Sequence, residues 1–392
     1  MSKLEELIQQ YCPDGVEWKT LGEATIMKRG TSATKGIMQE GNIPVISGGR
    51  QPAYYCNISN RTGEVITVAG SGAGAGYVQY WNEPIFVCDA FSIQGNETLK
   101  TKYVYYVLSS IQEKIYSTKK GGGVPHVHIS SIDKFEIPVP PLPVQEEIVR
   151  ILDTFTELQA ELQAELQKRK QQYNYYLDNL LNFNNISRGG QAEVRWMKMN
   201  EVFEIRNGYT PSKAKKEFWE GGTIPWFRME DIRQNGRILS DSILHITPKG
   251  VKGKGLFKAN SFILATTATI GEHALIIADS LANQQFTNLS IRKSLENELS
   301  VKYVYYYFFV IDEWCKANTN VSNFASVDMS KFYNLLIPIP SISEQQRIVS
   351  ILDRFDTLTT DLTQGLPAEI EKRRQQYEYY RDKLLTFKRK GA

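Results

Sequence analysis

This 392-residue chain contains an internal repeat, which constrains its fold more than any other feature of the sequence. The segment IPVP at Ile137–Pro140 is answered 200 residues later by IPIP at Ile337–Pro340. The match continues without a gap at Gln145, Ile148, Val149, Ile151, Leu152, Asp153 and Phe155, each repeated 200 positions later. The offset then becomes 204, and KRKQQYNYY at Lys168–Tyr176 returns as KRRQQYEYY at Lys372–Tyr380.

Outside these motifs the two halves match more weakly, but in the same order. Trp18 corresponds to Trp196 at an offset of 178 residues, and the sequence KYVYY at 102–106 returns at 302–306 at an offset of 200. We therefore predict an α+β fold with a pseudo-two-fold internal repeat, in which two mixed, β-rich domains are separated by two long helices. The expected divisions are a first domain at 1–143, a spacer helix at 144–187, a second domain at 188–342, a second spacer helix at 343–387, and a basic tail at 388–392.

Each spacer segment carries apolar residues at alternating spacings of three and four, which is the pattern of a narrow helical seam. A break is expected near Gly365–Pro367, because proline cannot continue a helix but can begin one. Two narrow seams in one chain predict an antiparallel coiled coil; the alternative is that each helix covers only its own domain. The expected pairing residues are Ile148, Leu152, Phe155, Leu162, Tyr173 and Leu180 in the first helix and Ile348, Leu352, Phe355, Leu362, Tyr377 and Leu384 in the second.

A glycine-rich stretch, Gly70–Gly76, matches the G-x-G-x-x-G/A spacing of a nucleotide-binding loop. Such a loop needs the N-terminus of a helix behind it. Here the alternating sequence YVQYW at 77–81 follows and predicts a strand instead. The counterpart in the second half, FILATTATIG at Phe262–Gly271, keeps only the last glycine. We interpret the stretch as a hairpin turn, with a stand-alone nucleotide-binding enzyme as the alternative.

Composition and missing motifs argue against several other classes. The 42% apolar content is too high for a disordered chain, and no apolar run reaches the length of a membrane span. Scattered cysteines and an acidic N-terminus favour a cytoplasmic protein without membrane association. Methyltransferase, P-loop and nuclease motifs are absent, and the pair His126 and His128 is not repeated in the second half. We expect no catalytic residue and no metal site in this chain.

The paired motifs P-x-P, I-V-x-I-L-D and K-R-x-Q-Q-Y-x-Y-Y, each placed after a variable domain, resemble the specificity (S) subunit of Type I restriction–modification systems. The opening segment, Cys12–Trp18, is also similar to that family. The resemblance implies a non-catalytic DNA-recognition subunit without a cofactor of its own. Two target recognition domains would each bind one half of a split, asymmetric site on double-stranded DNA. The paired helices would set the half-site spacing and dock two methyltransferase (M) subunits.

The same resemblance implies where the chemistry takes place. The M subunits would methylate adenine at N6 with S-adenosylmethionine, and restriction (R) subunits that use ATP and Mg can join the complex. Catalysis and cofactors would thus lie on partner subunits. A coiled-coil scaffold without DNA contact remains the third alternative.

DNA bases are recognised mainly by Arg, Lys, Asn and Gln, and phosphates by Lys, Arg, Ser and Thr. Candidate DNA-binding residues in expected loops of the first domain are Lys28, Arg29, Thr31, Arg50, Gln51, Lys119 and Lys120. Those in the second domain are Arg206, Asn207, Tyr209, Lys213, Lys215, Arg228, Arg233, Asn235, Arg237 and Lys252. The aligned sequences Lys28-x-Gly30 and Arg206-x-Gly208 are the strongest candidates because both halves keep them. Each of the others fits a solvated surface charge better than a contact with a base.

Overall fold

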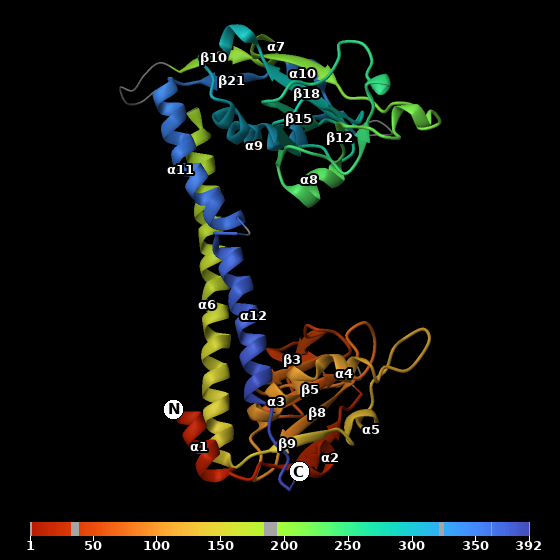
Figure 1. Ribbon diagram of the computed structural model, residues 1–392, viewed down its shortest axis with the longest axis vertical. Coiled ribbons are helices and arrows are strands. Elements are labelled where there is room, and N and C mark those ends of the chain that lie inside the picture. Colours follow the sequence, from red (N-terminus) through yellow and green to blue (C-terminus); the bar gives the residue numbers. More distant parts are fainter. Residues whose placement is uncertain (1, 33–38, 184–193, 321–324, 362, 392) are drawn as a thin grey trace. The chain divides into compact units, whose positions relative to one another are not determined.

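The computed structural model describes residues 2–32, 39–183, 194–320, 325–361 and 363–391 (Figure 1). The chain forms two compact units, which we call the first unit (Met1–Glu165 with Ala368–Ala392) and the second unit (Leu166–Pro367). Both units combine helices with β-sheets, so the fold belongs to the expected α+β class. The division falls inside the longest helix, α6 (Leu142–Leu181), so each unit contains one part of it. Within the described ranges, no helix is both long and apolar enough to cross a membrane.

The described residues of the first unit form three sheets, in the strand orders β1-β9, β2-β8-β5-β6 and β4-β3-β7. Its elements before α6 are α1 (Lys3–Tyr11), β1 (Glu17–Thr20), α2 (Leu21–Ala24), β2 (Thr25–Arg29), β3 (Ile43–Ile46), β4 (Tyr54–Cys56), β5 (Val65–Ala69), β6 (Val78–Trp81), β7 (Phe86–Val87), β8 (Ala90–Gly95), α3 (Thr101–Ser110), α4 (Gln112–Tyr116), α5 (Ile129–Ile132) and β9 (Glu136–Val139).

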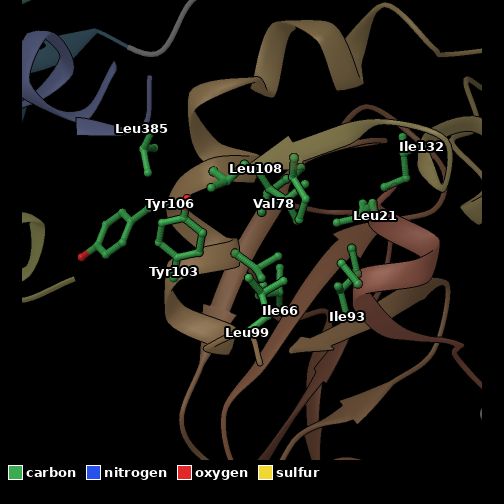
Figure 2. Close-up of a cluster of buried hydrophobic side chains, with 14 of the residues drawn as sticks. Leu21, Ile66, Val78, Ile93, Leu99, Tyr103, Tyr106, Leu108, Ile132 and Leu385 are labelled. Carbon is green, nitrogen blue, oxygen red and sulfur yellow. The ribbon is translucent and has the colours of Figure 1, made fainter. Parts of the chain in front are cut away.

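The core of the first unit lies between the sheet and helix α3, as Figure 2 shows. Strand β5 is rich in β-branched residues and is buried at all five positions, because both of its faces are covered. Ile66 and Val68 face the main core, and Val65 packs in a second cluster on the other face. Helix α3 packs on β5, β6 and β8 and contributes the fully buried Tyr103 and Leu108. Leu385, which follows α12 (Leu366–Leu384), joins the same cluster.

The second unit repeats these strand orders with β10-β21, β11-β18-β15-β16 and β14-β12-β17, and it adds β13 beside β16 and the pair β19-β20. Its sheets and helices are β10 (Arg195–Lys198), α7 (Met199–Val202), β11 (Phe203–Asn207), β12 (Ile224–Phe227), α8 (Met229–Asn235), β13 (Ile238–Leu239), β14 (His245–Ile246), β15 (Ser261–Ala265), β16 (His273–Ile276), β17 (Leu281–Ala282), β18 (Phe286–Ile291), α9 (Val301–Ala317), β19 (Thr319–Asn320), β20 (Ser326–Val327), α10 (Met329–Asn334), β21 (Leu336–Ile339) and α11 (Ile342–Thr360). Short 3-10 helices lie at η2 (Lys216–Phe218), η3 (Pro248–Gly250) and η4 (Lys293–Leu295).

The glycine-rich stretch Gly70–Gly76 is the turn of a β-hairpin, as the sequence predicted. It joins β5 to β6, which pair antiparallel, and no helix follows it directly. The corresponding turn of the second unit, residues 266–272, joins β15 to β16 in the same way. Both units therefore have an antiparallel hairpin at this position, although only the first turn is rich in glycine.

A buried glutamine attaches the start of each long helix to its variable domain. The side-chain amide of Gln145 donates to the carbonyl oxygens of Pro140 at 2.7 Å and Thr98 at 2.9 Å, and its oxygen accepts from the backbone N–H of Lys100 at 2.8 Å. Gln345 makes the same three bonds to the corresponding partners, each at 2.8 Å. Both glutamines are fully buried, so every polar group of the contact is paired inside the protein.

An aspartate further along each helix makes a second attachment. Asp153 accepts from the hydroxyl of Tyr106 at 2.5 Å and from the ammonium of Lys102 at 2.8 Å. Asp353 accepts from the corresponding tyrosine and lysine at 2.5 and 2.9 Å. We call the glutamine and aspartate contacts together the joint. The repeated sequences I-V-x-I-L-D and K-Y-V-Y-Y therefore recur because they build the same joint in both units.

The long helices also contact each other within each unit. In the first unit, the ring of Phe155 on α6 stacks on Tyr380 of α12, with centroids 5.5 Å apart. In the second unit, Phe355 of α11 contacts Tyr176 and Tyr173 of α6, at 5.1 and 6.5 Å. Of the other expected pairing residues, Ile148, Leu152, Ile348 and Leu352 are fully buried, and Leu162, Leu180, Tyr377 and Leu384 are half-buried.

The interruption expected near Gly365–Pro367 falls between two helices. Helix α11 ends at Thr360, and α12 begins at Leu366 with a proline in its first turn. Leu362 and the expected helical residues 184–187 lie outside the described residues.

The last described residues run beside the amino-terminal segment of the first unit. The backbone N–H of Val16 donates to the carbonyl oxygen of Lys388 at 2.9 Å, and that of Lys390 donates back to Val16 at 2.9 Å. Between them, the guanidinium of Arg389 donates to Glu136 at 2.7 Å and lies 5.3 Å from the ring centroid of Trp18. The tail thus forms part of the fold of the first unit.

Different side chains bond to the β5–β6 hairpin and to the β15–β16 hairpin. In the first unit, the amide of Gln112 bonds to the backbone of Gly76 at 2.7 Å and Val78 at 3.1 Å. The residue 200 positions later is Asp312, which accepts from Nδ1 of His273 at 2.7 Å and from Arg237 at 3.3 Å. The hairpin of the second unit is therefore held by a nearly buried charged network.

Burial among aromatic rings lowers the pKa of His273 below its ordinary value of 6.5, and the carboxylate of Asp312 opposes this shift only in part. The rings of Tyr305, Phe308 and Phe309 lie within 5.5 Å of the imidazole, centroid to centroid. Arg237 also disfavours the protonated form. The imidazole is thus held neutral in the folded state.

Replacement of either buried glutamine should loosen its own joint. In Gln345→Ala, one donor and two acceptors lose their partner, at about 1–3 kcal/mol for each group left unpaired. Hydrogen exchange at the Ser300 amide should accelerate, whereas Gln145→Ala should accelerate exchange at Lys100 only. Gln346→Ala changes the exposed neighbouring residue and serves as the control. Unchanged exchange at Ser300 in Gln345→Ala would refute the role of the joint.

The second unit should lose stability in mild acid. Because folding lowers the pKa of His273, the unfolded chain binds more protons below about pH 6.5. This contribution to stability is complete above pH 6.5 and declines as the pH falls further. The urea midpoint of the full chain should therefore fall less between pH 7.5 and 5.5 in His273→Gln than in the wild type. His128→Gln is the control, and an equal fall in all three proteins would contradict the prediction.

Candidate nucleic-acid interface

Three loops that carry sequence-predicted residues of the first domain meet around the turn Gly70–Gly76. The backbone N–H of Gly74 donates to the carbonyl oxygen of Gly48 at 3.2 Å, which brings the loop containing Arg50 and Gln51 against the turn. A Cβ atom at Gly48 would lie 2.2 Å from the carbonyl oxygen of Ser71, so this approach requires glycine. On the other side, Ser71 forms a β-bridge with His126, which in turn pairs with Lys120.

The end of strand β2 reaches the same place through another close backbone contact. A Cβ atom at Gly30 would lie 2.0 Å from the carbonyl oxygen of Cys88, and one at Gly208 would lie 2.2 Å from that of Asn283. Neither position has room for a side chain. The glycine of the aligned Lys/Arg-x-Gly sequence is thus kept in both halves for packing, whatever the neighbouring basic residue binds.

These segments enclose a hollow of about 360 Å³ in the first unit. We call this region the first corner, and its polar lining residues are Arg29, Ser32, Cys88, Asp89, His126 and His128. The two imidazole rings lie parallel with centroids 6.0 Å apart, and Asp89 accepts a hydrogen bond from Ser71. The first corner therefore presents both hydrogen-bond donors and acceptors. No group of three metal-ligating side chains occurs in the part of the chain that the structure describes.

The remaining candidates of the first domain lie on or beside the first corner. Lys28, Arg29, Thr31, Arg50, Gln51 and Lys120 are exposed, and Lys119 is half-buried. The guanidinium of Arg50 lies 5.0 Å from the ring centroid of Tyr77, and the ammonium of Lys119 lies 4.1 Å from that of Tyr116. Aromatic faces thus hold two of the cations in place. Contact of these side chains with DNA stays a prediction.

The second unit forms an equivalent region, the second corner, from residues 207–210, 266–272, 283–285 and 326–327. The backbone N–H of Tyr209 donates to Ala282 at 2.9 Å, and that of Thr266 donates to Gln285 at 3.0 Å. The N–H of Val327 completes the ring of contacts by donating to Thr266 at 2.9 Å. Asn207, a predicted site residue, accepts from the hydroxyl of Thr287 at 3.2 Å.

Two lysine-bearing loops pack beside the second corner. The hydroxyl of Tyr209 accepts from the backbone N–H of Lys252 at 2.6 Å and donates to Gly250 at 3.2 Å. The backbone N–H of Thr247 donates to Phe218 at 2.9 Å and joins the two loops to each other. The side chains of Lys213, Lys215 and Lys252 are exposed on these loops. Together they form a basic margin next to the second corner.

Other predicted residues of the second domain are engaged inside it. Arg206 donates to the carbonyl oxygens of Gly255 at 2.7 Å and Leu256 at 3.2 Å, and Arg237 belongs to the network around His273. The half-buried Arg228 forms an ion pair with Glu230 at 3.7 Å. Arg233 and Asn235 on α8 are exposed. Arg206 and Arg237 thus bond to backbone carbonyl oxygens of their own domain, and contact of either with DNA stays a prediction.

No motif or basic cluster in the sequence marks the amides of Asn283, Gln284 and Gln285. They form the turn between β17 and β18 within the second corner. The corresponding turn in the first corner, between β7 and β8, consists of Cys88 and Asp89. Alignment of these two turns would have drawn attention to both, because they join equivalent strands with unlike side chains.

Comparison with known proteins identifies relatives along nearly the whole chain. The family model described as Type I restriction modification DNA specificity domain matches residues 13–169 and 192–372. The chain is 36% identical over 430 residues to the Type I restriction enzyme EcoR124I/EcoR124II specificity subunit of Escherichia coli, covering 99% of this chain and 97% of that protein. It is 53% identical over 204 residues to the EcoprrI specificity subunit of Escherichia coli, a match spanning about half of each protein.

Solved structures show the same fold at lower identity. The S subunit of a Type I restriction-modification system from M. genitalium matches with a TM-score of 0.56 and 18% identity, covering 94% of this chain and 95% of that one. The HsdS subunit from Thermoanaerobacter tengcongensis matches with a TM-score of 0.51 and 17% identity, covering 96% and 97%.

Proposed function

The chain belongs to the Type I restriction–modification specificity-subunit family, and we propose that each of its two variable domains recognises one half of a bipartite, asymmetric DNA site. The observation that carries this proposal is the pair of corners. They are built on equivalent strands, but the first is lined by His126, His128 and Asp89 and the second by amides. Two similar frames with unlike polar surfaces suit two unlike sequences.

The long helices pair as an antiparallel coiled coil and set the distance between the two half-sites. The stacking of Phe155 on Tyr380 and of Phe355 on Tyr176 supports this pairing. Helix α6 has 40 residues, equivalent to about 60 Å, which is somewhat less than two turns of DNA. The joint supports the role of a spacer, because a flexible attachment would allow many spacings.

The helices also dock the catalytic partners, two methyltransferase subunits. Tyr175 is 65% exposed and Tyr379, at the equivalent position of the second copy, is 62% exposed. Two large aromatic side chains in equivalent settings suit two copies of one partner. Adenine-N6 methylation with S-adenosylmethionine belongs to those subunits, and ATP- and Mg-dependent cleavage belongs to restriction subunits that can join. The chain itself contributes no catalytic residue and acts on DNA in the cytoplasm.

Mapping of methylated adenine in host DNA tests the proposal. Deletion of the gene should abolish methylation of one bipartite motif, and expression of the full chain should restore it. If every methylated motif persists after deletion, the chain does not direct methylation. Persistence of every methylated motif is the result expected if the chain is a nucleotide-binding enzyme or a scaffold without DNA contact.

Removal of one helical turn from α6 should change the spacing of the motif. The deletion of 160–163 from the run TELQAELQAELQ shortens the helix by about 6 Å and nearly keeps the seam on the same face. The sequences of both half-sites should stay the same, and the preferred stretch of DNA between them should be shorter by roughly one or two base pairs. Binding to duplexes of graded spacer length measures this, with Glu161→Gln as the control of unchanged length. An unaltered optimum would contradict the role of the helices as a spacer.

A further inference from the structure

We propose that Gln284 recognises a base edge in the half-site bound by the second unit, with adenine as its preferred partner, and that Asn283 and Thr210 are positioning residues for it. This inference rests on the proposed function and names a specificity-determining residue within it. Gln284 lies at the tip of the turn between β17 and β18, and its side chain is exposed.

The backbone of this turn is held rigidly. The N–H of Asn283 donates to Phe227 at 3.0 Å, and the N–H of Phe286 donates back to Asn283 at 3.1 Å. The carbonyl oxygen of Gln285 accepts from Thr266 at 3.0 Å. The turn is thus bonded to two neighbouring segments of the second corner. A side chain on such a turn can be positioned to the accuracy that base recognition needs.

The amide groups of the turn divide into two roles. The oxygen of Asn283 accepts from the backbone N–H of Gln285 at 3.1 Å, and its nitrogen donates to the side-chain oxygen of Gln285 at 3.2 Å. Both ends of the Asn283 amide are therefore bonded within the turn. The side-chain oxygen of Gln284 accepts a single bond, from the hydroxyl of Thr210 at 2.5 Å.

This bond orients the amide of Gln284 and leaves part of its hydrogen-bonding capacity unused. An amide oxygen has two lone pairs, so one stays available, together with both hydrogens of the nitrogen. An acceptor and a donor side by side match the N6 amino group and N7 of adenine in the major groove. Guanine presents two acceptors at the same edge, so its O6 would face the remaining lone pair of the glutamine oxygen with no hydrogen between them.

Basic residues near Gln284 supply the part of DNA binding that does not depend on base sequence. Tyr209 follows Gly208 in the second corner and ties Lys252 to it through a 2.6 Å bond. The basic margin of Lys213, Lys215 and Lys252 is thus placed to contact phosphates while Gln284 meets a base. In the first corner, Asp89 occupies the equivalent turn and presents acceptors only. The two half-sites are therefore distinguished at this position.

Methylation mapping with the full chain and its methyltransferase subunits tests the assignment. Gln284→Ala should relax one base position in one half-site, with about tenfold or greater loss of preference for adenine, and leave the other half unchanged. Gln284→Glu should shift that position toward cytosine, whose amino group donates to a carboxylate. Lys252→Ala is the matched control and should weaken methylation of all sites without altering the motif.

The outcomes separate this inference from the proposed function. If deletion of the gene abolishes the motif but both Gln284 variants direct methylation of the unaltered motif with full preference, the assignment of Gln284 is wrong and the proposed function stands. If the deletion changes no motif, the proposed function fails first. Because Gln284 is exposed, both variants should fold, and Thr210→Val, which removes only the orienting hydroxyl, should give a smaller relaxation at the same position.

Discussion

The attachment of a long helix to each variable domain depends on one buried amide, Gln145 in the first unit and Gln345 in the second. An amide can be buried without penalty only if its donors and acceptor are paired, and here a single side chain bonds three backbone groups from two segments. Asp153 and Asp353 add a second contact eight residues, or about two turns, further along each helix. A helix held at two points cannot pivot on its domain. This requirement explains why the residues of the joint recur while the surrounding surfaces differ.

The two units show how one backbone can tolerate different interiors. The hairpin next to each corner is supported by Gln112 in the first unit and by the ionic network of Asp312 and His273 in the second. An amide and a paired carboxylate can satisfy similar positions, but the carboxylate requires a cation and a neutral imidazole nearby. The two turns differ as well: Gly72 has a positive φ in the first, and Ala268 has a φ of +62° in the second. An alanine in that region stores about 1–2 kcal/mol of strain, which the surrounding contacts offset.

Local patterns were sufficient to predict most of the architecture. Period and proline placement indicated the long helices and the break between α11 and α12, and the strand after Gly76 distinguished a hairpin turn from a nucleotide loop. Residue type alone was a poorer guide to which polar side chains are free to contact DNA. Arg206 and Arg237 were chosen for their charge, but both turn toward backbone carbonyl oxygens of their own domain. Gln284 was overlooked because no Lys or Arg lies beside it in the sequence, and its exposure depends on contacts between segments that are distant in sequence. No short segment of the sequence specifies such contacts.

The pairing of Val16 with Lys388 and Lys390 has a consequence for the order in which the protein is made. The hydrogen-bond partners of Val16 are more than 370 residues away, since 388 − 16 is 372. A ribosome releases residues from the amino terminus onward, at about 5–20 per second. The first unit therefore waits for residues 388–390 to emerge, while the second unit, which is continuous in sequence, can finish folding earlier. The domain whose synthesis begins first is the one completed last.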